Sequence, residues 1–326
     1  RATREEVASF GGYLWSPWVA AGVRPTDRIL TLESRHLRWA PPPWHCLQVR
    51  HEDSLDRRFE IFHRYRPTVV VGHTEAIVVL AREVQRRGMG RRNRVRLVFP
   101  FGWNLTPDAR RVIRNGMGAD PLDCYGAIET NWVGLQCQAR QGLHIPSHRL
   151  IVQVAEPGRD EPVKDPKRPG EFVLTDLGRL DMPVIRYRMA DVGRITLEPC
   201  PCGRPGLRIV DLGGRMLELF VAKDGRAVGP GTFKLWVDHQ GGVFTDFRVI
   251  QSNRERVVIE YVPGPTWSRE SMDKIRRRVL EVMGEVEVVE HVRREISTDP
   301  TTKHKRFVRA FDVPDDALLR GGVLLP

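Results

Sequence analysis

The sequence predicts an α/β fold, in which a large domain of layered strands and helices carries a β-subdomain and is followed by a small α+β domain. Three observations support this prediction. Strand-like and helix-like runs alternate in the first part of the chain, short β-like runs separated by Pro and Gly follow, and a hairpin, a helix and a strand come last.

The first part of the chain alternates between the two kinds of element. We expect helices over residues 3–22, 55–66, 74–88 and 106–116, and strands over 27–32, 68–72, 95–100 and, at its end, 121–126. Thr3 and Thr74 are plausible N-caps by residue type, and Gly88 is a typical helix stop. Because strands alternate with helices of this length, the strands are expected to form a mostly parallel sheet.

The pattern changes after residue 145. Short β-like runs cover residues 149–156, 170–177, 183–189, 192–197 and 207–214, and Pro and Gly separate them. Short strands at such spacing are typical of antiparallel sheets, so this part is expected to form the β-subdomain.

A Gly-Gly-Arg segment at 213–215 is expected to be a turn that introduces the last section. There, 243–262 is expected to be a hairpin around Ser252-Asn253 and 285–292 a strand. The run 268–284 has helical period, with one apolar face formed by Met272, Ile275, Val279 and Met283. The predicted domains are residues 1–215, a large domain that is incomplete at its N-terminal side, and residues 216–326, the small domain.

Composition narrows the class of function. The formal charge is +11, but only seven of the 52 basic residues are lysine, and the arginines are interleaved with acids throughout the chain. A nucleic-acid-binding protein more often concentrates its charge on one face, so nucleic acid is not an expected partner. No apolar run approaches the roughly 18 residues of a membrane span, and no signal peptide opens the chain, so we expect a cytoplasmic protein that does not contact membranes.

The five cysteines raise the question of a metal site. "PCPCGR" places Cys200 and Cys202 one residue apart, and "LQCQARQGLHI" holds Cys137 and His144. Three Cys and one His form a common structural zinc site, but the Cys-x-Cys spacing is unusual for one. From spacing alone, a zinc site and a set of unligated buried thiols both remain open.

Five motifs occur in order along the chain: "DCYGAIET", "GLHI", "GEFVLTDLGRLDMPVIRYRMADVG", "CPCGR" and "GGRMLELFVAKDGRAVGP". Together they resemble the adenylate-forming enzymes, in particular the branch similar to phenylacetate–CoA ligase. The resemblance implies a large βαβ-layered domain with a β-subdomain and a small mobile C-terminal domain. It also implies that Cys137, His144, Cys200 and Cys202 bind a structural zinc ion.

The resemblance implies a reaction in two steps. A carboxylic acid, which in this family is usually aromatic, attacks ATP to give an acyl-adenylate and pyrophosphate, and a thiol such as CoA then displaces AMP. The implied cofactors are ATP/AMP, Mg²⁺, structural Zn²⁺ and CoA or another thiol acceptor, and a carrier protein is a possible partner. Tyr125 and Gly126 resemble the nucleotide-binding pair whose tyrosine stacks on adenine, and Glu129 resembles the carboxylate that helps to hold Mg²⁺.

The remaining implied site residues lie further along the chain. Asp191 resembles the aspartate that accepts both ribose hydroxyls, and Arg215 the arginine that closes the nucleotide pocket. Lys303 resembles the lysine that reaches the reacting carboxylate and the α-phosphate, with Lys305 as a competitor for that role.

The sequence also departs from the family pattern. No Ser/Thr/Gly-rich phosphate-binding loop is present, and since the chain begins at Arg1 rather than Met, we expect that an upstream segment supplies it. Ile128 replaces the usual Thr or Ser before the glutamate, and Ala190 replaces the usual Gly before Asp191. Two readings besides the ligase therefore stay open: a weak or inactive adenylate-binding homologue that acts as a partner or scaffold, and a zinc-stabilised binding protein.

Overall fold

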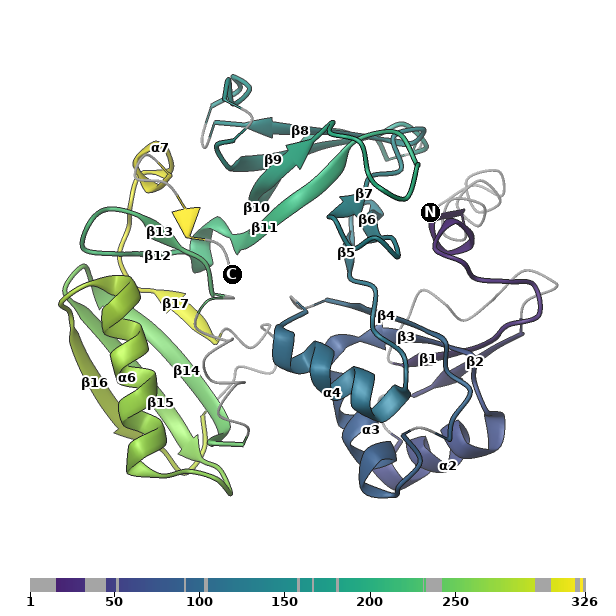
Figure 1. Cartoon of the computed structure of the whole chain (residues 1–326). Coiled ribbons are helices and arrows are strands. Elements are labelled where there is room, and N and C mark those ends of the chain that lie inside the picture. Colours follow the sequence, from purple (N-terminus) through teal and green to yellow (C-terminus); the bar gives the residue numbers. More distant parts are fainter. Residues whose placement is uncertain are drawn as a thin grey trace. The chain divides into compact units, whose positions relative to one another are not determined.

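The computed structural model describes residues 16–32, 45–50, 53–90, 92–102, 105–156, 159–165, 167–179, 182–230, 232, 242–296, 306–319 and 323–324 (Figure 1). The chain divides into two compact units. Unit 1 comprises Arg1–Val152, Leu174–Tyr187 and Thr196–Val210, and unit 2 comprises Gln153–Val173, Arg188–Ile195 and Asp211–Pro326. The predicted domain boundary after residue 215 stays a prediction. Among the described residues, no helix is long and apolar enough to span a bilayer.

Unit 1 contains the predicted parallel sheet. Its strands are β1 (Arg28–Leu32), β2 (His45–Val49), β3 (Val69–His73) and β4 (Leu97–Phe101), in the order β2-β1-β3-β4 with parallel pairing throughout. Strand β2 was not predicted, because this edge strand is mostly half-buried or exposed and lacks an apolar run. The α/β fold class is confirmed by this parallel sheet and by the sheets with antiparallel pairs that follow.

Three helices accompany the parallel sheet, namely α2 (Leu55–Tyr65), α3 (Thr74–Arg86) and α4 (Pro107–Met117), and Figure 1 shows them side by side. The hydroxyls of Ser54 and Thr106 cap α2 and α4 by accepting hydrogen bonds from backbone N–H groups in their first turns. The apolar faces of the helices and the buried strand residues form one core. The predicted cap Thr74 is instead the first helical residue, and His73 occupies the N-cap position.

A second, seven-stranded sheet has the order β5-β6-β7-β11-β10-β9-β8. Its strands are β5 (Cys124–Ala127), β6 (Asn131–Gln136), β7 (Leu143–His144), β8 (Leu150–Ala155), β9 (Gly170–Asp176), β10 (Val184–Thr196) and β11 (Arg208–Arg215). Strands β5, β6 and β7 lie in unit 1, and the other four strands have residues in both units. The Gly-Gly-Arg segment at 213–215 lies inside β11, so the predicted turn there was wrong.

Strand β10 joins two runs that the sequence suggested were separate strands. Arg186 and Ala190 lie within it at φ +48° and +56°, in the left-handed region that non-glycine residues seldom adopt. The Arg186 N–H donates to Thr175 Oγ1 at 3.0 Å and the Ala190 N–H to Glu171 Oε1 at 3.2 Å, so a side chain satisfies the backbone at both irregular positions. These irregularities interrupt the alternation that normally identifies a strand.

The C-terminal part of unit 2 is built on the sheet β16-β15-β14-β17. It comprises β14 (Phe244–Asn253), β15 (Arg256–Pro263), α6 (Arg269–Met283), β16 (Glu287–Val292) and β17 (Phe307–Arg309). The predicted hairpin, helix and strand are confirmed, and the hairpin turns at 254–255, just after the expected Ser252-Asn253. The four predicted apolar residues of α6 are all buried in the core of this sheet.

Short elements complete unit 2. They are η1 (Met216–Glu218), β12 (Phe220–Val221), β13 (Ala227–Val228), α7 (Asp315–Leu318) and β18 (Val323–Leu324), and the three strands pair in the order β12-β13-β18. Around them, Met216, Leu219 and Val221 share a small core with Val313 and Leu318.

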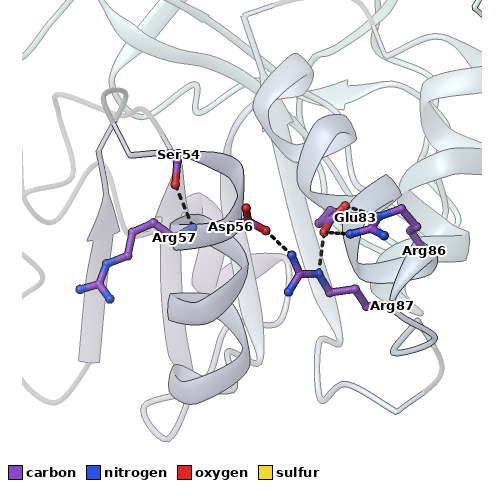
Figure 2. A network of polar contacts seen from close by, with 6 residues as sticks. All are labelled: Ser54, Asp56, Arg57, Glu83, Arg86 and Arg87. Atoms are coloured by element: carbon purple, nitrogen blue, oxygen red, sulfur yellow. Dashed lines mark hydrogen bonds and ion pairs between the residues drawn. The ribbon is translucent and has the colours of Figure 1, made fainter.

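An ionic network joins α2 to α3 (Figure 2). The nearly buried carboxylate of Glu83 accepts hydrogen bonds from the guanidinium groups of Arg86 and Arg87, and Arg87 also pairs with Asp56 on α2. The Arg87 guanidinium lies 4.1 Å from the centroid of the Phe59 ring. Hydrogen bonds from the two arginines outweigh burial and lower the pKa of Glu83 to about 2.

The network predicts a pH-dependent stability. A carboxyl whose pKa is lowered by folding stabilises the protein above its unfolded pKa, near 4.5, and loses that contribution as the pH falls towards 2. The difference in unfolding midpoint between the wild type and Glu83→Gln should therefore be largest at pH 6 and shrink between pH 5 and 2.5. Denaturant titrations across this range measure it. Glu60→Gln, which removes an exposed pair with Arg57, is the control, and a midpoint difference for Glu83→Gln that stays constant with pH would contradict the prediction.

Ala190 predicts a gain in stability on substitution. Ala190 lies at φ +56°, where glycine is less strained than alanine. In Ala190→Gly, the free energy gained by relieving this strain should exceed the free-energy cost of the greater entropy of the unfolded chain. We therefore expect the free energy of unfolding to rise by about 0.5–1 kcal/mol. Ala127→Gly on β5 is the matched control, and it should lower stability by a similar amount because Ala127 is absent from the positive-φ residues. Equal losses in both variants, measured by urea unfolding, would rule out strain at Ala190.

Candidate active site and metal centre

The four predicted metal ligands lie together in unit 1. The ligand atoms of Cys137, His144, Cys200 and Cys202 are all within 4.8 Å of one another. The Sγ atoms of Cys137 and Cys200 are 3.6 Å apart, and Cys202 Sγ lies 3.3 Å from His144 Nε2. Since Zn–S bonds of about 2.3 Å give sulfur–sulfur separations of about 3.8 Å in a tetrahedron, these residues fit a metal of that size.

Three chain segments deliver the ligands. Cys137 follows β6, His144 ends β7, and the two remaining cysteines lie in the turn between β10 and β11. That turn closes through a hydrogen bond from the Gly203 N–H to the Cys200 carbonyl at 2.9 Å, with Gly203 at φ +78°. The glycine that follows the Cys-x-Cys pair therefore allows both thiols to turn towards the same point.

Arg208 connects all three segments. It is almost fully buried and pairs directly opposite His144 where β7 and β11 run antiparallel. Its guanidinium donates to the carbonyl of Gln141, in the loop after Cys137, and to those of Glu198 and Pro199, just before Cys200, the last two at 2.7 and 3.4 Å. One cation thus fixes the backbone around the cluster.

The electrostatics of the cluster favour the metal-binding protonation state at His144 and Cys202 but oppose it at Cys200. Burial, together with the nearby Arg204 and Arg208, lowers the pKa of His144 to about 4, so its ring is neutral at pH 7. Burial raises the pKa of Cys202, but hydrogen bonds from Arg204 and from the other two thiols outweigh it and bring the value to about 7. Burial raises the pKa of the Cys200 thiol.

Three of the candidate nucleotide-binding residues lie on one hairpin of unit 1. Tyr125 and Gly126 lie at a bulge in β5, and Glu129 lies in the turn to β6. A Cβ at Gly126 would come within 2.7 Å of the Asn131 carbonyl, so only glycine fits there. The Glu129 carboxylate accepts a hydrogen bond at 3.0 Å from the hydroxyl of Tyr187, on β10.

The other two described candidates lie in unit 2. Asp191 is nearly buried on β10, and Arg215 ends β11 with a largely exposed side chain. Arg215 Nε lies 3.9 Å from Asp191 Oδ1, which is a loose ion pair. The structure thus brings Asp191 and Arg215 together, while Lys303 and Lys305 lie outside the described residues.

Sequence comparison finds related proteins. The chain is 27% identical over 172 residues to phenylacetate-coenzyme A ligase from Thermus thermophilus and 25% identical over 174 residues to that from Pseudomonas putida. Each match covers 52% of this chain, and the chain spans only 38% and 39% of the lengths of these two curated relatives. No protein-family model matches the chain.

Structure comparison extends the likeness to nearly the whole chain. A 2-hydroxyisobutyryl-CoA ligase in its postadenylation state matches 94% of this chain and 70% of its own, with a TM-score of 0.76 and 17% identity. The anthranilate CoA ligase AuaEII matches 90% of this chain and 61% of its own, with a TM-score of 0.65 and 12% identity. The chain has the CoA ligase fold. Together with the sequence matches, this fold confirms the predicted resemblance to the phenylacetate–CoA ligase branch.

The contacts of two residues, Arg208 and Tyr187, with the candidate site were not predicted from the sequence. Arg208 lies in an ordinary β-like run and Tyr187 in the motif that also holds Asp191, and neither was assigned a contact. Each hydrogen bond joins residues that are far apart in sequence, with 67 residues from Arg208 to Gln141 and 58 from Tyr187 to Glu129. The strand register would have indicated the contact of Arg208, because pairing β11 against β7 places Arg208 opposite His144.

The cluster predicts a bound metal that stabilises the fold. Cys200→Ser should lose most of the bound divalent metal and lower the thermal midpoint, because a hydroxyl is a much poorer ligand than a thiolate. Metal analysis of the purified protein and unfolding with and without a chelator measure both effects. Cys46→Ser is the control because Cys46 lies outside the cluster. A wild type whose stability is unchanged by complete metal removal would contradict the prediction.

Proposed function

We propose that the chain activates a carboxylic acid with ATP as an acyl-adenylate and then transfers the acyl group to a thiol such as CoA. The observation that carries this proposal is the sequence similarity to phenylacetate-coenzyme A ligases, because a shared fold alone leaves the reaction open. Aromatic acids are the first substrates to test, since the similar proteins act on phenylacetate and the structural neighbour AuaEII acts on anthranilate.

The proposed chemistry needs positioning more than covalent catalysis. In the first step a carboxylate oxygen bonds to the α-phosphorus of ATP and pyrophosphate leaves. In the second, the thiol sulfur bonds to the acyl carbon, AMP leaves and the thiol proton goes to solvent. The protein must align two anions and offset the charge that develops between them.

The described residues supply groups of the right chemistry. Tyr125 offers an aromatic ring for adenine, beside Gly126, where the close Asn131 carbonyl leaves no room for a side chain. Asp191 offers two oxygens on one carboxylate for the two ribose hydroxyls, with Arg215 beside it. We assign Lys303 to the reacting carboxylate and the α-phosphate.

Glu129 fits the role of a magnesium ligand. Within the described residues its side chain has a hydroxyl partner and no ion pair, so its negative charge is not offset by a neighbouring cation. Magnesium, when bound with ATP, offsets the charge of the phosphates. The proposal also includes a cytoplasmic location and an acceptor thiol that is either CoA or the arm of a carrier protein.

We also propose that the metal at the four-residue cluster is zinc and that its role is structural. The donor set of three thiols and one imidazole suits zinc, and it leaves no coordination position for a substrate. The ligand segments are tied together by Arg208, so the metal stabilises the strands β6, β7 and β11 rather than taking part in acyl transfer.

ATP–pyrophosphate exchange tests the proposed function. We expect exchange that depends on one class among a panel of aryl and alkyl carboxylic acids, measured with this chain and in parallel with the complete product of its coding sequence. Exchange supported by a single acid establishes adenylation of that acid and identifies the substrate class, and formation of the CoA thioester from the same acid then tests the second step. AMP binding without exchange in both proteins would contradict the proposal and favour an adenylate-binding homologue.

Lys303→Ala refines this test. Loss of one cation at the developing charge should lower exchange by about 10²-fold or more, while transfer from a preformed acyl-adenylate to CoA changes little. Lys305→Ala is the matched control and should retain exchange close to wild type. Equal losses in both half-reactions for Lys303→Ala, or a reversal between the two lysines, would overturn the assignment of Lys303.

A further inference from the structure

Glu129 lies on a turn whose backbone is firmly held. The next residue, Thr130, is fully buried, and Asn131 begins β6 at φ +61°. Ile128, on the other side, is 82% exposed. The turn therefore fixes the Cα of Glu129 but leaves its long side chain at the surface, where it would sample several rotamers without a further contact.

The hydroxyl of Tyr187 supplies that contact. It donates to Glu129 Oε1 at 3.0 Å from β10, a strand 58 residues away in sequence. The irregularity at Arg186 positions the tyrosine. Because Arg186 is left-handed and its N–H is bonded to Thr175, residues 185, 186 and 187 are all exposed in succession, and a regular strand would have turned one of them inward.

The chemistry of the donor matters as much as its position. Elsewhere in this arginine-rich chain, arginines pair with the buried carboxylates Glu83, Glu171 and Asp176. In the described residues, the Glu129 carboxylate has only the neutral phenol as partner. A phenol orients a carboxylate without cancelling its charge, and it occupies one oxygen while the second stays open to a cation.

We propose that Tyr187 is a positioning residue, which holds Glu129 in the rotamer that presents Oε2 to the divalent cation accompanying the nucleotide phosphates. This inference rests on the proposed function and extends it to a residue with no assigned role. Tyr187 is not itself a ligand; it acts through Glu129.

Manganese binding tests the proposal directly. Mn²⁺ affinity is measured by electron paramagnetic resonance in the presence of a non-hydrolysable ATP analogue, for the wild type, Tyr187→Phe and Glu129→Gln. We expect about tenfold weaker Mn²⁺ binding in Tyr187→Phe, a typical loss when the group that orients a metal ligand is removed. Affinity for the analogue without metal and the thermal midpoint should match the wild type, because the ring is retained.

Tyr65→Phe is the matched control. It also removes a phenol that donates a hydrogen bond within unit 1, to the His45 carbonyl at 2.8 Å, but its partner belongs to the edge of the parallel sheet. Its Mn²⁺ affinity should equal that of the wild type.

The outcomes separate the two levels of inference. If Glu129→Gln weakens Mn²⁺ binding and Tyr187→Phe does not, the positioning role is overturned and the proposed function stands. If neither variant changes Mn²⁺ binding, or the wild type binds none with the analogue, the assignment of Glu129 fails and the role of Tyr187 fails with it. Equal weakening in Tyr65→Phe and Tyr187→Phe would show a general effect of lost hydroxyls and also overturn the positioning role.

Discussion

Pairing between arginine and a buried carboxylate ties distant segments together in both units, through Asp27 and Asp176 in unit 1 and Glu171 in unit 2. Asp27, just before β1, is nearly buried and paired with Arg96, just before β4, and Arg96 also donates to the Gly22 carbonyl at 2.9 Å. Burial raises the pKa of Asp27, but hydrogen bonds, first from Arg96, leave it below its usual value. Arg149 and Asp176 form a second pair, with the carboxylate side chain wholly buried. Removing one partner of a buried pair typically costs roughly 3–5 kcal/mol, so these arginines cannot be exchanged freely.

This pairing also affects which partners the carboxylates of the candidate site have. A chain that pairs its structural carboxylates with arginine must keep the carboxylates of the candidate site out of such pairs if they are to bind a cation or sugar hydroxyls. The Glu129 carboxylate accepts a hydrogen bond from the Tyr187 phenol. Asp191 Oδ1 lies 3.9 Å from Nε of Arg215, whose side chain is largely exposed. By contrast, Arg188, three residues before Asp191, forms an ion pair with Glu171. Strand β10 therefore carries both the close Arg188–Glu171 pair and Asp191, whose Oδ1 lies 3.9 Å from Arg215 Nε.

The sequence allowed much of the fold to be predicted, because long apolar runs and helical periods report local structure. The helices α2, α3, α4 and α6 and the hairpin β14–β15 are confirmed on that basis. The small strands β2 and β7 were missed, since each is stabilised by its partner strand rather than by a pattern of its own. The irregularities at Arg186 and Ala190 were also missed, although Ala190 stands where the family usually has glycine. Its positive φ explains that glycine in physical terms.

The candidate site, like the fold, was predicted in part from the sequence. The four residues of the metal cluster were proposed from motif resemblance, and the structure brings their ligand atoms together. What no local pattern could reveal is the pair of long-range hydrogen bonds that support the two sites, from Arg208 to Gln141 and from Tyr187 to Glu129. Both depend on which strands become neighbours and in what register. A motif therefore identifies candidate ligand-binding groups more readily than the residues that contact those groups from distant strands.

Arg208 also bears on the role proposed for a metal at the cluster. A site assembled only by its metal would have ligand segments without other connections, and metal binding would then be part of folding. Here a buried guanidinium already joins the loop after Cys137 to the turn before Cys200, and its own backbone pairs with His144. The candidate ligands are thus prearranged by the hydrogen bonds of a buried guanidinium. On the proposed structural role, a metal at the cluster would strengthen a framework that protein hydrogen bonds have already defined.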